Sequence, residues 1–425
     1  MAFIAISAAI LYCEIRRESG IDVFSPVSVF LFITFLFFLL PELFSFNNDT
    51  FQNVPGEIYV LISMIFFFAG YVCLSDKTGF RTGSVAWVSR QSMYLFCAIF
   101  VPISMIIFLG IIMSYGGLVN YLSDIWNASR STMSGKAYLV EIMSVPALAS
   151  YFLFADYFTR KRRSELFLAA IVLVFGATLT LIISAERGSI VIPLFTIFVI
   201  RHYLGGRFKA RDLLLPAAVV IFLILILGSI RDYVQFGNIL KEDYSVYLGA
   251  KDMAAYFILH TGGMIHDVYS NIIENVPDRL NYQYGMTYLV FAIKFVPRMF
   301  IPDKIQGASQ VLMEKLYPDV SNVYFAPSYL GELYMNFGFA GIIVGAFVFG
   351  LACGWLYAFL KNNIESKLAV ILYATLLPSV ISQMRGDFGN ASTGMLTSLF
   401  KILVVYLLLR MFDSAARNVK IGSSS

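Results

Sequence analysis

Two Arg-Gly pairs are the residues of this chain best placed to do chemistry. Arg187-Gly188 lies in the run SAERGS, and Arg385-Gly386 lies in the run QMRGDFG. Each pair falls where one very apolar segment ends and the next one begins. A charged side chain at a membrane edge is costly, so such residues are usually functional. Because the two turns share one pattern, we expect them to bind the same kind of ligand.

The chemistry of an Arg-Gly turn favours a phosphate ligand. The planar guanidinium can hold two phosphate oxygens at once, which a lysine cannot do. The glycine lets an anion approach the backbone. A helix that begins there would add unpaired N–H groups and the positive end of its dipole. The turns predict a site for a doubly charged anion such as a lipid-linked pyrophosphate. The alternative is that both arginines extend to lipid headgroups.

Three further arginines are candidates for the same anion site. Arg298 lies in KFVPRMFIP between two prolines, which would hold it rigidly near the membrane surface. Arg130 and Arg279 belong to other polar loops and are included for their charge. Lys401 lies inside an apolar segment, where we expect it to pair with a carbonyl or to line a cavity.

Candidate bases come from histidine and from carboxylates. His260 shares one predicted helix face with Asp252, and a neutral imidazole can accept a hydroxyl proton near pH 7. Glu332 in PSYLGELYMNFG and Asp387 in QMRGDFG are rival bases, with Glu186 as a fourth candidate. The alternative is that the histidine only makes loop hydrogen bonds and that the carboxylates have structural partners.

The composition places the chain in a membrane. It is 59% hydrophobic and 14% charged, whereas a soluble domain is about half apolar and about a quarter charged. Mean hydropathy is +0.75. We therefore predict an all-α polytopic integral membrane protein whose apolar runs span the bilayer as helices.

Several classes of chemistry have no sequence support. The chain contains no Walker A motif, no GxGxxG, no GxSxG, no HExxH and no Asp-x-Asp pair. Its four cysteines have neither metal-ligand spacing nor the look of a disulfide framework. We expect no cofactor, no metal and no nucleic-acid partner. Energy for a reaction outside the cytoplasm would then come from an activated substrate or from a gradient.

About eleven spanning segments can be identified, together with one long loop. The spans lie at residues 2–13, 26–45, 57–75, 92–114, 137–158, 165–184, 189–204, 212–230, 338–360, 368–383 and 391–411. Three regions follow: the first eight spans (1–230), the loop (231–337), and the last three spans with a tail (338–425).

The basic residues predict the orientation. One alternate set of short loops carries most of the lysines and arginines, and the positive-inside rule places that set in the cytoplasm. Both Arg-Gly turns and the loop 231–337 then face outward. Loops of this length are usually functional. Within it we predict an amphipathic helix at 254–264 and a short apolar or re-entrant one at 286–295.

Three runs resemble a known family. They are YGMTYLVFAIKFVPRMFIPDK, PSYLGELYMNFGFAGI and QMRGDFG, and the turns SAERGS and YGGLVNYLSDIWNASR fit the same pattern. Together they resemble the bacterial O-antigen and capsule repeat-unit polymerases of the Wzy type. The resemblance covers most of residues 115–400, and its motifs are loose.

The resemblance implies an inner-membrane, metal-independent glycosyltransferase with a GT-C-like helical fold and a periplasmic active site. Such enzymes join undecaprenyl-pyrophosphate-linked oligosaccharide units. By resemblance, Arg187, Arg298 and Arg385 would hold the pyrophosphate while a base deprotonates the acceptor hydroxyl. A chain-length-regulating co-polymerase is a candidate partner.

Other membrane proteins are alternatives. An O-antigen ligase has a similar outline but transfers the finished chain to lipid A core. A lipid-linked oligosaccharide flippase would be expected to show inverted repeats and polar residues at mid-membrane. The spans here are apolar apart from Lys401 and a few polar positions, which disfavours transport. A scaffolding protein would leave the paired Arg-Gly turns without a role.

Overall fold

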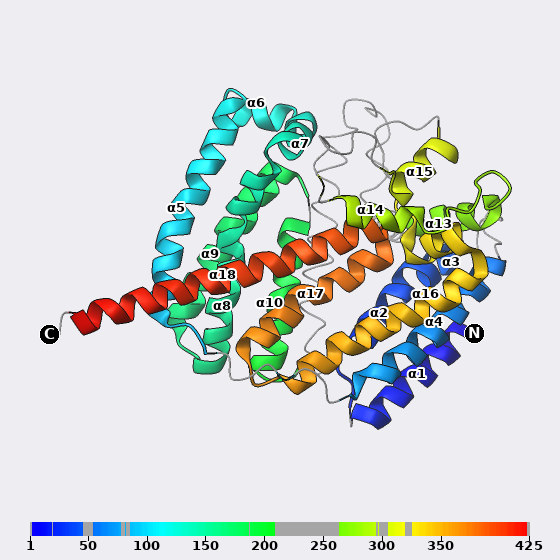
Figure 1. Ribbon diagram of the computed structural model, residues 1–425, viewed down its shortest axis with the longest axis horizontal. Coiled ribbons are helices and arrows are strands. Elements are labelled where there is room, and N and C mark those ends of the chain that lie inside the picture. Colours follow the sequence, from blue (N-terminus) through cyan, green and yellow to red (C-terminus); the bar gives the residue numbers. More distant parts are fainter. Residues whose placement is uncertain are drawn as a thin grey trace. The chain divides into compact units, whose positions relative to one another are not determined.

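The fold is helical throughout the part of the chain that the structure describes. The computed structural model describes residues 2–18, 20–45, 54–77, 81, 86–186, 188–208, 263–294, 296, 305–318 and 325–422, and no strand occurs among them. Figure 1 shows the arrangement. The elements are α1 (Ala2–Glu18), α2 (Pro26–Thr34), the π-helical turn η1 (Phe35–Leu39), α3 (Leu40–Ser45), α4 (Val54–Ser75), α5 (Arg90–Ser114), α6 (Leu118–Ser123), α7 (Ile125–Met143), α8 (Val145–Arg160), α9 (Arg163–Ser184), α10 (Gly188–Leu204), α13 (Met264–Asn275), α14 (Met286–Lys294), α15 (Ala308–Lys315), α16 (Ser328–Asn362), α17 (Lys367–Arg385) and α18 (Phe388–Gly422).

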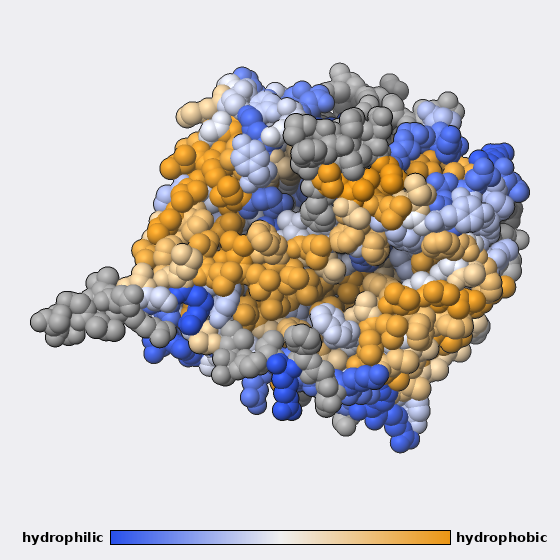
Figure 2. All heavy atoms as spheres, in the orientation of Figure 1, coloured by the Kyte–Doolittle hydropathy of each residue, from blue (hydrophilic) through white to orange (hydrophobic). Residues whose placement is uncertain are grey.

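Seven described helices are long and apolar enough to cross a membrane, which indicates a multi-pass membrane protein. Two shorter apolar helices, Pro26–Glu42 and Gly188–Leu204, accompany them. Every predicted span falls on a described helix except 212–230, which lies outside the described residues. Figure 2 shows apolar side chains covering most of the visible helix flanks.

The chain divides into two compact units. Unit 1 comprises Met1–Arg81, Asp243–Asn362 and Leu376–Thr397, and unit 2 comprises the remaining segments. Helices α17 and α18 each contribute residues to both units. All of the site geometry described below lies within unit 1.

Small residues let the backbones of α4 and α16 touch in unit 1. A Cβ added to Gly350 would lie 2.0 Å from the carbonyl oxygen of Phe67, and one on Gly354 would lie 2.4 Å from that of Tyr71. This is the spacing by which small residues bring membrane helices together. Because both pairs advance four residues in the same direction, the two helices run parallel. The alternation of spans predicts the same direction for both.

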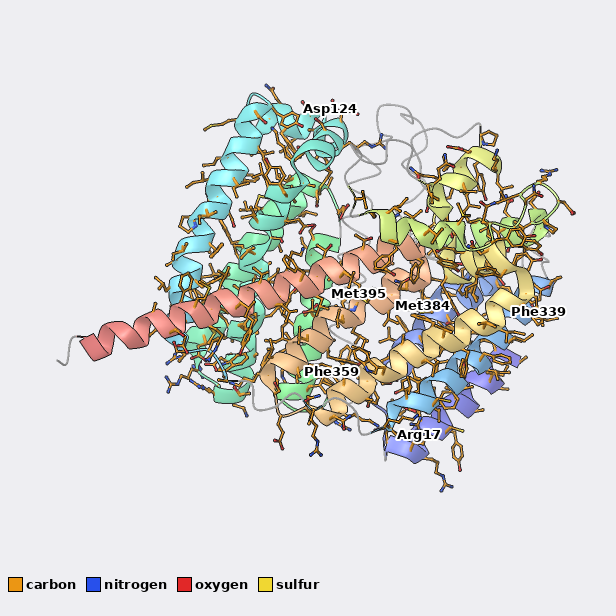
Figure 3. The ribbon with its side chains drawn as sticks, in the orientation of Figure 1. Arg17, Asp124, Phe339, Phe359, Met384 and Met395 are labelled. Atoms are coloured by element: carbon orange, nitrogen blue, oxygen red, sulfur yellow. The ribbon has the colours of Figure 1, made fainter. Side chains whose placement is uncertain are left out.

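One end of unit 1 is charged. Lys361, near the end of α16, donates to Glu18 Oε1 and Asp76 Oδ1, both at 2.8 Å. Arg17 at the end of α1 pairs with Asp76, which follows α4, and with Glu14 at 3.1 Å. Three helices therefore end on one side, joined by ion pairs. Figure 3 labels Arg17 there, and Figure 2 shows hydrophilic side chains along the same edge.

At the other end of unit 1, the long loop contributes a packed helical layer. Val268 and Ile272 on α13 pack with Val311 and Leu312 on α15 and with Met335 on α16. This layer is anchored to α4, because the Tyr269 hydroxyl donates to the Gly56 carbonyl at 2.9 Å.

The helix boundaries in the long loop differ from those predicted. The helix expected at 286–295 is present as α14. For the one expected at 254–264, residues 254–262 lie outside the described residues, and α13 begins at Met264. Helix α16 begins at Ser328, ten residues before the predicted span at 338, because its first part packs with α13 and α15.

Unit 2 has its own core. Phe108 and Ile111 on α5 pack with Tyr121 on α6, Met143 on α7 and Ile183 on α9.

Lys401, which belongs to unit 2, has a carboxylate partner where a carbonyl partner or a cavity was expected. Its Nζ donates to Glu141 Oε2 at 2.6 Å. The charge of this lysine is therefore met by a carboxylate of the same unit.

Candidate functional site

An interruption of α16 at Gly338 positions the segment that leads into the site. Gly338 has φ 60° and ψ −149°, a conformation essentially reserved for glycine, so the helical hydrogen-bond ladder is interrupted there. The carbonyl groups of Met335 and Asn336 instead accept the N–H groups of Gln283 (3.0 Å) and Tyr284 (3.2 Å). The segment that leads into α14 is thereby fixed against the part of α16 that precedes Gly338.

Glu332, in the part of α16 that precedes Gly338, is the buried centre of the site. Its carboxylate accepts the Thr287 hydroxyl at Oε1 (2.7 Å) and the Phe388 backbone N–H at Oε2 (2.6 Å). Only 1% of the residue is exposed, and no described lysine or arginine forms an ion pair with it. One carboxylate therefore joins α14, α16 and the first residue of α18.

Asn336 completes this arrangement one turn further along α16. Its side-chain amide donates to Thr287 Oγ1 and to the Glu332 carbonyl, both at 2.8 Å, and its Oδ1 accepts the Gly285 N–H at 2.8 Å. The hydrogen bonds run in one direction, from the Asn336 amide to the Thr287 hydroxyl and on to the Glu332 carboxylate. Such a chain makes Glu332 an acceptor at both oxygens.

Asp387 caps the start of α18. Its Oδ1 accepts the Asn390 backbone N–H (2.8 Å), and its Oδ2 accepts the Asn390 side-chain amide (2.8 Å) and the Ser309 hydroxyl of α15 (3.0 Å). An aspartate at this position satisfies an otherwise unpaired donor of the helix. The Lys294 ammonium donates to Asn390 Oδ1. Helices α14 and α15 thus both contact this capped turn.

These contacts overturn one expectation about the start of α18. We predicted unpaired N–H groups there for a phosphate, but those of Phe388 and Asn390 already donate to carboxylates. The carboxyl oxygens that already occupy these donors also leave little room for an anion on the same backbone groups. The prediction was wrong because the partner carboxylate, Glu332, comes from a distant part of the chain.

Arg385 remains the candidate anion ligand of this turn. It is the last residue of α17, and its side chain is exposed. Gly386 closes the end of the helix by donating its N–H to the Ser382 carbonyl at 2.9 Å. The buried Asp387 follows directly. Arg385 is therefore an exposed cation on a turn that two buried carboxylates hold in place.

The other predicted site residues are distributed as follows. The structure brings Glu332, Asp387 and Arg385 together in unit 1, and it places Arg279 with an exposed side chain in the turn after α13 of the same unit. Arg130, on α7, and Glu186, after α9, are exposed in unit 2. Three predicted residues lie outside the described residues: Arg187, Arg298 and His260.

Some members of the site were not predicted from the sequence. Thr287 and Asn336 lie inside two of the runs that carry the family resemblance, yet only their position in otherwise apolar stretches could have indicated them. Nothing in the sequence indicated that Lys294 or Asn390 would belong to the site.

In chemical terms, the described site can present a cation but no exposed base. Both oxygens of Glu332 and of Asp387 accept hydrogen bonds from the protein, so these carboxylates position the turn. Among the described residues, no group of three or more His, Cys, Asp or Glu side chains could hold a metal ion.

Comparisons with protein-family models, with curated proteins and with solved structures found no match to this chain. The resemblance to repeat-unit polymerases therefore rests on its sequence runs, and the function has to be argued from the chemistry of the site.

Proposed function

We propose that this chain is a bacterial inner-membrane glycosyltransferase that polymerises undecaprenyl-pyrophosphate-linked oligosaccharide units on the periplasmic face. The product would be O-antigen or a related surface polysaccharide. The observation that carries the proposal is Arg385, an exposed guanidinium on a turn fixed by two buried carboxylates. A preorganised cation of this kind suits an anion whose charge grows as it leaves.

The proposed reaction exchanges one bond for another. The acceptor hydroxyl oxygen forms a glycosidic bond to the donor's anomeric carbon, while the bond from that carbon to the pyrophosphate oxygen breaks. Undecaprenyl pyrophosphate leaves as an anion held by Arg385, with Arg298 as a second candidate ligand. The hydroxyl proton passes to a base, for which His260 is the candidate, because Glu332 and Asp387 are buried.

The proposed topology has about eleven spans in a GT-C-like arrangement, with the Glu332 end of unit 1 outside. The ion-pair cluster around Arg17 and Lys361 marks the opposite end, and basic residues favour the cytoplasm. The orientation is tested with a membrane-impermeant thiol reagent in a chain whose exposed Cys13 and Cys73 are changed to serine. Leu289→Cys should react in intact cells, and Arg16→Cys only after permeabilisation. The opposite pattern would invert the topology.

The activity is tested by extending a defined lipid-linked repeat unit with purified protein in the presence of a chelator. We expect a ladder of polymer on the lipid carrier, which Arg385→Ala abolishes. Arg16→Ala is the matched control, because Arg16 is an exposed arginine at the charged end of unit 1. A single transfer to lipid A core would identify a ligase. Movement of the lipid across the membrane without a new glycosidic bond would identify a flippase.

A further inference from the structure

We propose that Glu332 is a positioning residue and not the base of the reaction, and that with Thr287 and Asn336 it latches the external helix α14 to the turn that carries Arg385. The inference rests on the proposed function, since it assigns a role within that reaction. It concerns three side chains that together join α14, α16 and α18.

Burial argues against Glu332 as the base. A general base must come within about 2.6–3.2 Å of the proton that it removes. The carboxylate of Glu332 is buried, and its two oxygens already accept the Thr287 hydroxyl and the Phe388 N–H. Turning it toward a substrate would leave both donors unsatisfied in the protein interior, which is unfavourable.

The same contacts explain how Glu332 can act on Arg385. Phe388 follows Arg385 by three residues, so the bond to its N–H fixes the turn between α17 and α18. Packing supports that bond, because a Cβ added to Gly389 would lie 3.2 Å from Val290 Cγ1 of α14. A shift of α14 is therefore passed to the turn through two hydrogen bonds that share Glu332, and the space beside Gly389 is too narrow for α14 to move closer freely.

The hydrogen-bond chain makes the latch depend on three residues at once. Asn336 orients the Thr287 hydroxyl toward Glu332 and also holds the Gly285 N–H at the start of α14. Buried polar networks of this kind are rigid when every member is satisfied. Losing the Thr287 hydroxyl alone should therefore loosen the contact between α14 and Glu332. Through Glu332 it should also loosen the turn that carries Arg385, which lies on a different helix.

The kinetic test compares conservative and disruptive variants during extension of the lipid-linked unit. Glu332→Gln keeps an acceptor for Phe388 but not for Thr287, so it should raise the donor KM as Thr287→Val does and retain kcat within about threefold, since a lost base would cost about 100-fold or more. Thr287→Val should raise the KM for the donor about tenfold, the loss expected for one buried hydrogen bond, and Glu332→Leu, which loses two, should raise it at least as much. Thr287→Ser keeps the hydroxyl and should behave as the unmodified protein.

A double variant that includes Arg385 distinguishes a positioning role of the Thr287–Glu332 contact from a general loss of protein stability. In an Arg385→Lys background, Thr287→Val should raise the donor KM by clearly less than tenfold, because residues that act through one another are not additive. Fully additive effects would overturn the latch. So would a collapse of kcat in Glu332→Gln together with normal kinetics in Thr287→Val, because that result makes Glu332 the base.

A distance measurement tests the latch without relying on activity. Spin labels at Leu289→Cys on α14 and Leu396→Cys on α18, both exposed positions, are placed in the Cys13→Ser, Cys73→Ser background. We expect one narrow distance distribution that Thr287→Val broadens and Thr287→Ser leaves unchanged. An unchanged distribution in Thr287→Val overturns the latch. A narrow distribution with no chain extension by the unmodified protein overturns only the proposed function.

Discussion

The carboxylate of Glu332 accepts the backbone N–H of Phe388 at 2.6 Å across 56 residues of sequence. This contact brings the start of α16 to the junction between α17 and α18. It also occupies the helix start that a phosphate would otherwise use. Anion binding at this turn is thereby left to side chains, and first of all to Arg385.

Lysine should replace Arg385 poorly. The ammonium is a point charge and cannot reproduce the bidentate fork of a guanidinium on phosphate oxygens. We expect Arg385→Lys to reduce chain extension about tenfold and Arg385→Ala to abolish it, with both variants still in the membrane. The measurement is polymer length and donor KM, with Arg16→Lys as control. Normal-length polymer from both Arg385 variants would show that the diphosphate is held elsewhere.

Gly338 should not tolerate a side chain. Its φ of 60° strains any other residue, and a Cβ would lie 3.0 Å from the Tyr282 hydroxyl oxygen. Gly338→Ala should destabilise the part of α16 that precedes residue 338 by on the order of 1–3 kcal/mol. Hydrogen exchange should report faster exchange of the Gln283 and Tyr284 amides. Gly307→Ala is the control, because nothing lies within 4 Å of the added methyl group. Equal exchange in both variants would contradict the account of the break.

Gly350 should be equally sensitive for a different reason. A methyl group there would lie 2.0 Å from the Phe67 carbonyl oxygen, so α4 and α16 would have to separate. We expect Gly350→Ala to lower the free energy of unfolding by ~2 kcal/mol or more, as overpacking does. Titration with a denaturing detergent measures this. Gly394→Ala on α18, which has open space around it, should change little. A neutral Gly350→Ala would mean that the two helices do not pack this closely.

Acid should weaken the charged end of unit 1. Partial burial raises the pKa of Asp76, but hydrogen bonds from Lys361 and Arg17 outweigh this and leave it below its usual value. A carboxyl group with a lowered folded-state pKa stabilises the protein above its unfolded pKa of about 3.9 and loses that contribution as the pH falls through the folded value. Asp76→Asn should therefore melt at a lower temperature than the unmodified protein at pH 7, and the gap should close below about pH 4. A gap that is independent of pH would assign the effect to packing.

The sequence predicted the described apolar helices because a long apolar run in a membrane must satisfy its backbone hydrogen bonds internally, which favours a helix. It also predicted the short helix at 286–295 and the position of Arg385 at the end of a span. It could not predict that Thr287 and Glu332 would meet, because 45 residues separate them and neither helix pattern specifies its partner. The prediction of unpaired N–H groups at the start of α18 was wrong for the same reason, because the Phe388 N–H donates to the distant Glu332. The division into two units also follows from contacts between distant segments, which a chain without internal repeats does not reveal.

The interrupted ladder at Gly338 has a mechanical consequence for α16. Because the break separates them from the stretch that follows, the ten residues before it are held by contacts with α13, α14 and α15. A displacement of those three helices would move the start of α16 and, through Glu332, the α17–α18 junction, without requiring movement of the ion pairs at the far end of α16. The two parts of the helix can therefore move separately.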